Sequence, residues 1–348
     1  MNKLTRWIKQ HQVTSFFALT YALSWGLWLP WMLTRIELLE LLGFIALFVP
    51  ALACIVIARV VDPGTAEDSR RARRMAFLAA WILVTAIFIL NARSSSGIPL
   101  PVAVVVFAVV GLIPAFVIAS GFSANPGVRA RLASLVRPRG HLLWYLLALL
   151  LVPALRLLSV PVSRLLGLET ISAPAPTGGA WALAGSVAIS FFYTVIAAGG
   201  LNEETGWTGF ALPGLQTRHS PLVASVILWF FWILWHMPLH FAGVWNPDIE
   251  SLVRALVGTF FARFIFTWLY NRSKGGIWTA ILFHATANVA FEFLPVTQVQ
   301  FVLEAVIAIA VVLGDRMWKK LPAGSRAVYE AAPRAGASDE GGIRHATV

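Results

Sequence analysis

Residues 181–212 read WALAGSVAISFFYTVIAAGGLNEETGWTGFAL, and this stretch decides the fold expected for the whole chain. It is apolar at most positions, yet it contains the adjacent pair Glu203 and Glu204. A carboxylate inside a bilayer costs roughly 2.5–3.5 kcal/mol on insertion scales, and two neighbouring like charges also repel each other. The pair therefore indicates a functional site inside a membrane segment, the alternative being a solvated helix end.

The composition of the whole chain is that of a membrane protein. Of its 348 residues, 58% are hydrophobic and 12% are charged, and the mean hydropathy is +0.76. Soluble domains carry about 25% charged residues. The net charge of +11 does not predict nucleic-acid binding, because the basic residues fall in short clusters between apolar segments. Cys54 stands alone in an apolar run, and we interpret it as a small buried hydrophobe.

Ten apolar segments are long enough, or nearly so, to span a bilayer, which takes about 20 residues of helix. They are residues 15–33, 38–61, 75–91, 100–120, 142–162, 181–212, 221–242, 252–270, 277–293 and 297–314. The first follows Lys3, Arg6 and Lys9, but it is longer than a signal peptide and lacks a cleavage site. The sequence thus predicts an all-α polytopic membrane protein with about ten transmembrane helices.

Basic residues gather on one side of these segments, as the positive-inside rule requires. If the N-terminus is cytoplasmic, the inside set is Lys3, Arg6, Lys9, Arg70, Arg71, Arg73, Arg74, Arg129, Arg131, Arg137, Arg139, Arg218, Arg272, Lys274, Arg316, Lys319 and Lys320. The outside loops hold only Arg35, Arg93 and Arg164. We therefore expect both termini in the cytoplasm and a location in a bacterial plasma membrane.

The chain divides into three parts by composition. Residues 1–175 hold about five helices with few polar residues and are predicted to be a transmembrane scaffold. Residues 176–320 hold the other five and are predicted to be the reactive core, because intrahelical polar residues concentrate between 199 and 290. Residues 321–348 are rich in Ala, Gly, Ser and charge, which predicts a disordered cytoplasmic tail.

Three further polar side chains belong with the glutamates. His236 lies deep in segment 221–242, and His284 and Asn288 lie one helical turn apart, on one face of segment 277–293. At 1.5 Å per residue, these groups fall within the membrane at depths that tilts and helix breaks can bring together. Pro213 and Pro238 are the predicted breaks.

Two kinds of chemistry suit this set. A carboxylate and a neutral imidazole can act together as general base on a shared water, while a second histidine and an asparagine donate to an oxyanion. Alternatively, Glu203, His236 and His284 are a zinc ligand set with an open fourth position. Either arrangement predicts hydrolysis of an acyl or peptide bond.

Three motifs in this order resemble one known family. They are Glu203-Glu204-Thr-Gly-Trp-Thr-Gly-Phe-Ala-Leu-Pro213, then Trp232-Ile-Leu-Trp-His236, then His284-Ala-Thr-Ala-Asn288. Over roughly residues 180–295 they resemble the CPBP family of intramembrane proteases, which covers CAAX proteases and bacteriocin-processing proteins and is also called Abi. The resemblance implies an intramembrane endopeptidase acting on a membrane-bound or lipid-modified substrate.

The resemblance also implies a role for each matching residue. Glu203 would activate water together with His236, and Glu204 would be a supporting or alternative acid. His284 and Asn288 would stabilise the oxyanion. Family members are described as metalloproteases, although a glutamate mechanism without obligatory zinc has also been argued, so both remain open here.

Two positions depart from the family pattern. The arginine expected four residues after the second glutamate is Thr208, and the phenylalanine that opens the second motif is Trp232. Loss of the arginine removes a cation that could hold a glutamate ionised. Arg263 or Arg156 is the candidate to replace it in space.

Two other functions stay open at this point. Thr208 favours a catalytically weakened member of the family that acts as an immunity or scaffold protein. A buried set of Glu and His could also couple a transporter to protons, although the two halves show no repeat symmetry. The expected partners are the lipid bilayer and a membrane-associated peptide or protein substrate, with no nucleic acid.

Overall fold

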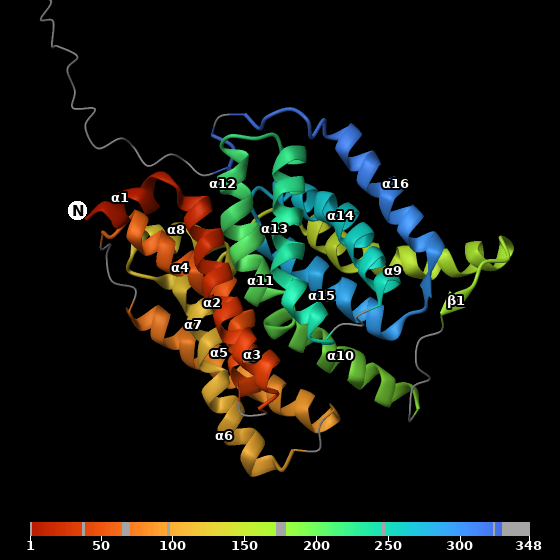
Figure 1. Ribbon diagram of the computed structural model, residues 1–348, viewed down its shortest axis with the longest axis horizontal. Coiled ribbons are helices and arrows are strands. Elements are labelled where there is room, and N and C mark those ends of the chain that lie inside the picture. Colours follow the sequence, from red (N-terminus) through yellow and green to blue (C-terminus); the bar gives the residue numbers. More distant parts are fainter. Residues whose placement is uncertain are drawn as a thin grey trace, which may run out of the picture.

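The computed structural model describes residues 2–36, 39–64, 70–95, 98–171, 179–244, 248–322 and 324–328. These residues form a helical membrane protein, as predicted (Figure 1). The first half contains α1 (Lys3–Gln10), α2 (Gln12–Thr34), α3 (Glu40–Leu47), α4 (Val49–Val61), α5 (Arg70–Ser95), α6 (Leu100–Val110), α7 (Leu112–Ala119), the short turn η2 (Ser120–Phe122), α8 (Pro126–Val136) and α9 (Leu142–Leu165).

The second half begins with α10 (Ala180–Ala197), α11 (Leu201–Gly206), the π-helical turn η3 (Trp207–Ala211) and α12 (Leu212–Gln216). It continues with α13 (Pro221–Phe241), α14 (Ile249–Arg272), α15 (Ile277–Phe293) and α16 (Gln298–Gly314). Two short strands, β1 (Thr170–Ile171) and β2 (Val296–Thr297), pair antiparallel and join the end of α9 to the start of α16.

Helix forms in each of the ten segments predicted to span the bilayer. Among the described residues, seven helical runs are long and apolar enough to cross a membrane unaided: Gln12–Thr34, Arg70–Ser94, Leu100–Phe122, Leu142–Leu165, Ala180–Gln216, Pro221–Phe241 and Ile249–Arg272. The other three segments form shorter helices, namely α3 with α4, α15 and α16. Apolar side chains such as Leu83, Val105 and Leu150 lie exposed on the outer faces, where lipid would cover them.

Sequence signals explain where the site-bearing helices begin. The side chain of Ser220 accepts a hydrogen bond from the Val223 amide, and Pro221 follows as the first residue of α13. The side chain of Asp248 caps α14 in the same way by accepting from the Ser251 amide. These caps satisfy backbone donors that a helix end leaves without partners, and so they fix the starting points of both helices.

The helix break that matters lies at glycines rather than at prolines. α10 ends at Ala197, and Gly199 adopts φ +116°, a conformation that side chains larger than glycine rarely adopt. Pro213 instead occupies the first turn of α12, and α13 continues through Pro238 to Phe241. The predicted breaks at Pro213 and Pro238 are therefore wrong. A proline is tolerated in a first turn, and Pro238 lies so close to the end of α13 that few hydrogen bonds depend on it.

The segment that carries the two glutamates runs through the centre of the molecule. Every residue from 201 to 216 is buried. α11 packs directly on α4, and a Cβ at Gly206 would lie 2.4 Å from the carbonyl oxygen of Pro50. In Figure 1 this green segment lies between the orange helix α4 and the blue helices α15 and α16.

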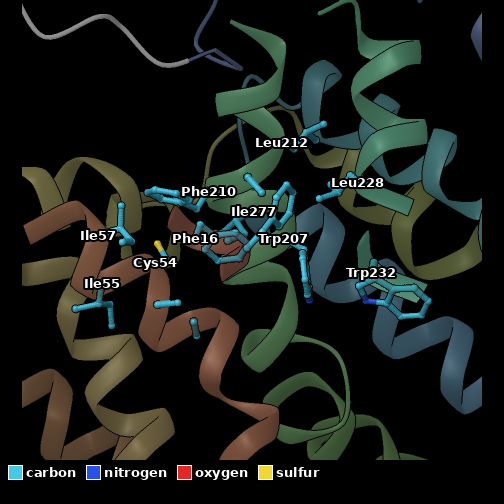
Figure 2. Close-up of a cluster of buried hydrophobic side chains, with 14 of the residues drawn as sticks. Phe16, Cys54, Ile55, Ile57, Trp207, Phe210, Leu212, Leu228, Trp232 and Ile277 are labelled. Atoms are coloured by element: carbon cyan, nitrogen blue, oxygen red, sulfur yellow. The ribbon is translucent and has the colours of Figure 1, made fainter. Parts of the chain in front are cut away.

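Aromatic packing holds this central segment in place. The Trp207 ring meets the Phe16 ring edge to face at 5.4 Å, and Phe210 packs against the same Phe16 ring (Figure 2). Edge-to-face aromatic pairs contribute about 0.5–1.5 kcal/mol beyond the area that they bury. Cys54 belongs to the same cluster and is fully buried, which confirms its interpretation as a core residue.

The predicted tail begins with an ordered stretch. Ala327 is buried, and its carbonyl oxygen accepts a hydrogen bond from Nε2 of Gln216 at 2.9 Å. Residues 324–328 thus pack on the end of the central segment, although disorder was predicted from residue 321. The remaining part of the predicted tail, residues 329–348, lies outside the described residues.

Candidate active site

The five predicted site residues come from three helices. α11 contributes Glu203 and Glu204, α13 contributes His236, and α15 contributes His284 and Asn288. The structure brings the first four together as two pairs of one glutamate and one histidine. Glu203 is 4% exposed and Glu204 is 0% exposed, so the two carboxylates do not lie at a solvated helix end.

The first pair is Glu203 with His236. Their closest atoms, Oε1 of Glu203 and Nε2 of His236, lie 3.7 Å apart. Nδ1 of His236 is 2.9 Å from the carbonyl oxygen of Trp232. Because a carbonyl oxygen only accepts, Nδ1 carries the hydrogen, and in the neutral ring Nε2 is then an acceptor that faces Glu203.

Trp232 is a further member of the site that the sequence interpretation treated only as an aromatic exchange. Its indole Nε1–H donates a 2.7 Å hydrogen bond to Oε2 of Glu203. A phenylalanine at this position could not make this bond. The exchange therefore adds a donor to the glutamate, and the indole N–H was the signal available in the sequence.

The second pair is Glu204 with His284. Nδ1 of His284 lies 2.8 Å from Oε1 of Glu204, a hydrogen bond that the imidazole donates to the carboxylate. The opposite ring nitrogen faces the helix break, and a Cβ built on Gly199 would lie 2.2 Å from Nε2. The glycine thus gives His284 its space as well as allowing the break.

Asn202 fixes the helix break in position. Its side-chain oxygen accepts from the Gly199 amide at 2.9 Å, and its Nδ2 donates to the carbonyl oxygen of Leu47 at 3.2 Å. Asn202 is fully buried. Through this residue the first half of the chain supports the site directly.

Asn288 lies one turn beyond His284 on α15, as predicted, but its side chain is exposed. Its Nδ2 donates to the carbonyl oxygen of Ala198 at 2.9 Å. Asn288 therefore contacts the helix break and not the two glutamates. Because a carboxamide has two N–H groups, one donor hydrogen is left for another acceptor.

An arginine distant in sequence completes the surroundings of Glu204. Nη1 of Arg263, on α14, lies 3.4 Å from Oε2 of Glu204 and 3.2 Å from Oγ1 of Thr208. The Thr208 hydroxyl donates to the same carboxylate oxygen. Arg156 lies elsewhere, with its Nη1 3.4 Å from the carbonyl oxygen of Pro295. Of the two candidate replacements for the expected arginine, Arg263 is the one at the site.

The donor arrangement does not fit the predicted zinc ligand set. Across the ranges that the structure describes, no group of three His, Cys, Asp or Glu side chains is placed to hold a metal ion. Nδ1 of His284 is bonded to Glu204, and its Nε2 faces Gly199 rather than Glu203 and His236. Zinc on Glu203, His236 and His284 stays a prediction, and no step below depends on it.

A large cavity lies beside the site rather than in it. Its volume is about 1940 Å³, and its walls include Gly209 and Pro213 of the central segment together with His11, Arg131 and Arg139. None of the five predicted site residues lines it. The cavity thus reaches the central segment at η3 and α12 and not at the predicted site residues.

Comparison with known proteins identifies the same part of the chain. Residues 185–290 match a family model described as type II CAAX prenyl endopeptidase Rce1-like. The chain is also 32% identical, over 177 residues, to a CAAX prenyl protease 2 of Methanococcus maripaludis. That match covers 48% of this chain and 64% of the relative. The resemblance proposed from the three motifs is confirmed, and all five predicted site residues fall inside the matched range.

Proposed function

We propose that this integral membrane protein is an endopeptidase that hydrolyses a peptide bond in a prenylated, membrane-associated substrate. The observation that carries the proposal is the placement of Glu203 against His236 beside Glu204 against His284, from three helices, in one buried region. The match of residues 185–290 to prenyl endopeptidases supports the substrate class.

The geometry of the first pair suits water activation. Oε1 of Glu203 and Nε2 of His236 are both acceptors and lie 3.7 Å apart. A water about 2.8 Å from each atom would donate one O–H to each of them. The base takes one proton as the water oxygen attacks the carbonyl carbon of the substrate, a form of catalysis that contributes typically 10²–10⁴-fold.

The second pair suits stabilisation of the oxyanion that this attack creates. With Nδ1–H donating to Glu204, a protonated ring of His284 would present Nε2–H on the opposite side. The carboxylate orients and stabilises such an imidazolium, as an aspartate does in serine proteases. The second N–H of Asn288, one turn along α15, is a further donor for the same oxygen.

Collapse of the tetrahedral intermediate completes the reaction. The C–N bond breaks, and the proton that the base took from water passes to the leaving amine. The products are a carboxylic acid, which contains the oxygen and the second proton of the water, and an amine. At neutral pH that second proton passes to the amine, which gives a carboxylate and an ammonium group. No proton or electron is left over, so the proposal needs no other reactant than water.

Product analysis with the purified chain tests this proposal. A peptide with a prenylated cysteine followed by three residues would be incubated in ¹⁸O-labelled water, and the products would be identified by mass spectrometry. The expected result is cleavage, with one ¹⁸O in the new carboxylate. The same peptide without its prenyl group is the matched control. An intact prenylated peptide, in lipid bilayers as well as in detergent, would contradict the proposal.

A further inference from the structure

Arg263 is a charged residue buried within the apolar helix α14. It lies in the second half of α14, a helix long and apolar enough to span the membrane, and it is only 3% exposed. A buried guanidinium is costly unless it is paired. Arg263 is paired with Glu204, although 59 residues separate the two in sequence.

The guanidinium is held in position by more than its charge partner. Its carbon atom lies 4.5 Å from the centre of the Phe266 ring and 5.7 Å from the centre of the Trp232 ring. Both distances lie in the range of a cation–π contact, worth up to about 2 kcal/mol in a desolvated position. Trp232 is the residue that donates to Glu203, so Arg263 contacts Glu204 of the second pair directly and the first pair through Trp232.

The two oxygens of Glu204 have different partners. Oε1 accepts from His284, while Oε2 receives the Thr208 hydroxyl and lies near Nη1 of Arg263. A carboxylate held at Oε2 can move little at Oε1. The orientation of His284 therefore depends on the contacts at the other end of Glu204.

Thr208 is short enough to leave room for this arrangement. Its Oγ1 lies 3.2 Å from Nη1 of Arg263, so a longer side chain at position 208 would enter the space that Arg263 occupies. An arginine at position 208 and an arginine at position 263 would thus place a guanidinium in the same space beside Glu204. This chain has the arginine at position 263.

We propose that Arg263 is a positioning residue, which fixes Glu204 and through it His284, and that it replaces in space the arginine absent at position 208. This inference rests on the proposed peptidase function, because it assigns Arg263 to the oxyanion side of that reaction. Arg263 itself need not touch the substrate.

Moving the arginine from position 263 to position 208 tests the inference through enzyme activity. Arg263→Ala is expected to lower kcat about 10²-fold, the scale of a misplaced reacting group, with KM nearly unchanged. Arg263→Lys keeps the positive charge but not the planar guanidinium, so its kcat should lie between those of wild type and Arg263→Ala. The exchange Thr208→Arg with Arg263→Thr should recover most of the kcat that Arg263→Ala loses. Full activity of Arg263→Ala would overturn the inference.

A second readout does not depend on cleavage. Apparent unfolding midpoints would be measured for wild type, Arg263→Ala, Glu204→Gln and the double variant. Coupled residues give a double variant that is less destabilised than the sum of the single variants, whereas strictly additive shifts would contradict the inference. If wild type cleaves nothing, the peptidase function fails, and the midpoints still decide whether Arg263 holds Glu204.

Discussion

Nε2 of His236 lies 3.7 Å from Oε1 of Glu203, and the opposite nitrogen of the same ring is fixed by the carbonyl oxygen of Trp232. This bond sets the tautomer in which Nε2 is the proton-accepting nitrogen of the neutral ring. A general base needs this combination of orientation and proton-accepting capacity. The position of His236, four residues beyond Trp232 on the same helix, provides both.

Replacement of His236 is expected to remove most of the activity. His236→Ala should lower kcat by about 10²–10⁴-fold, the usual contribution of an acid–base group. His219→Ala is the matched control, because His219 lies in the turn between α12 and α13, outside the candidate site. Rates of peptide cleavage by the two purified variants give the comparison. Equal rates would mean that His236 does not act in the reaction.

The indole of Trp232 is predicted to matter through its N–H. Trp232→Phe keeps an aromatic ring next to Arg263 but removes the donor to Oε2 of Glu203. A hydrogen bond to a charged group is worth about 1.5–3 kcal/mol, so kcat should fall roughly tenfold or more. Steady-state kinetics of this variant check the prediction, and an unchanged kcat would show that Glu203 does not need this donor.

The helix break should tolerate no side chain at Gly199. Gly199→Ala places a Cβ 2.2 Å from Nε2 of His284 on a backbone with φ +116°, so both activity and thermal stability should drop. Gly185, in the first half of α10, is the matched control, because a Cβ there meets nothing within 4 Å. Gly185→Ala should be at least as stable as wild type. Similar behaviour of both variants in unfolding and cleavage assays would argue against the strain assigned to Gly199.

Metal dependence separates the two chemistries that the sequence left open. The described side chains of Glu203, His236 and His284 do not converge on one point, so cleavage is expected to survive treatment with a chelator. Elemental analysis of the purified protein, before and after chelation, checks that metal was removed. Loss of cleavage on chelation, with recovery on adding zinc, would restore the zinc hypothesis.

Much of this site could be predicted from the sequence because its signals are local. Glutamates in an apolar run, a histidine deep in a span, and His284 with Asn288 at one-turn spacing are all visible in the printed chain. The hydrophobic segments were long enough to identify by composition, and helix forms in every one of them.

The remaining features depend on contacts between distant segments. The approach of Arg263 to Glu204 requires the relative rotation of α14 and α11, which no periodicity within either helix specifies. The break at Gly199 depends on Asn202, which also bonds the distant Leu47. The π-helical turn at Trp207–Ala211 packs against α2, α8, α13, α14 and α15. Prolines are the stronger local signal for a break, and for that reason Pro213 and Pro238 were misleading.

The most direct test of the account is the effect of one atom exchange at Glu203. Glu203→Gln keeps the size of the side chain but removes the carboxylate that faces His236, while Glu292→Gln makes the same change on an exposed part of α15. Glu203→Gln should lose about 10²–10⁴-fold in the rate of prenyl-peptide cleavage, and Glu292→Gln should cleave like wild type. Undiminished cleavage by Glu203→Gln would contradict it.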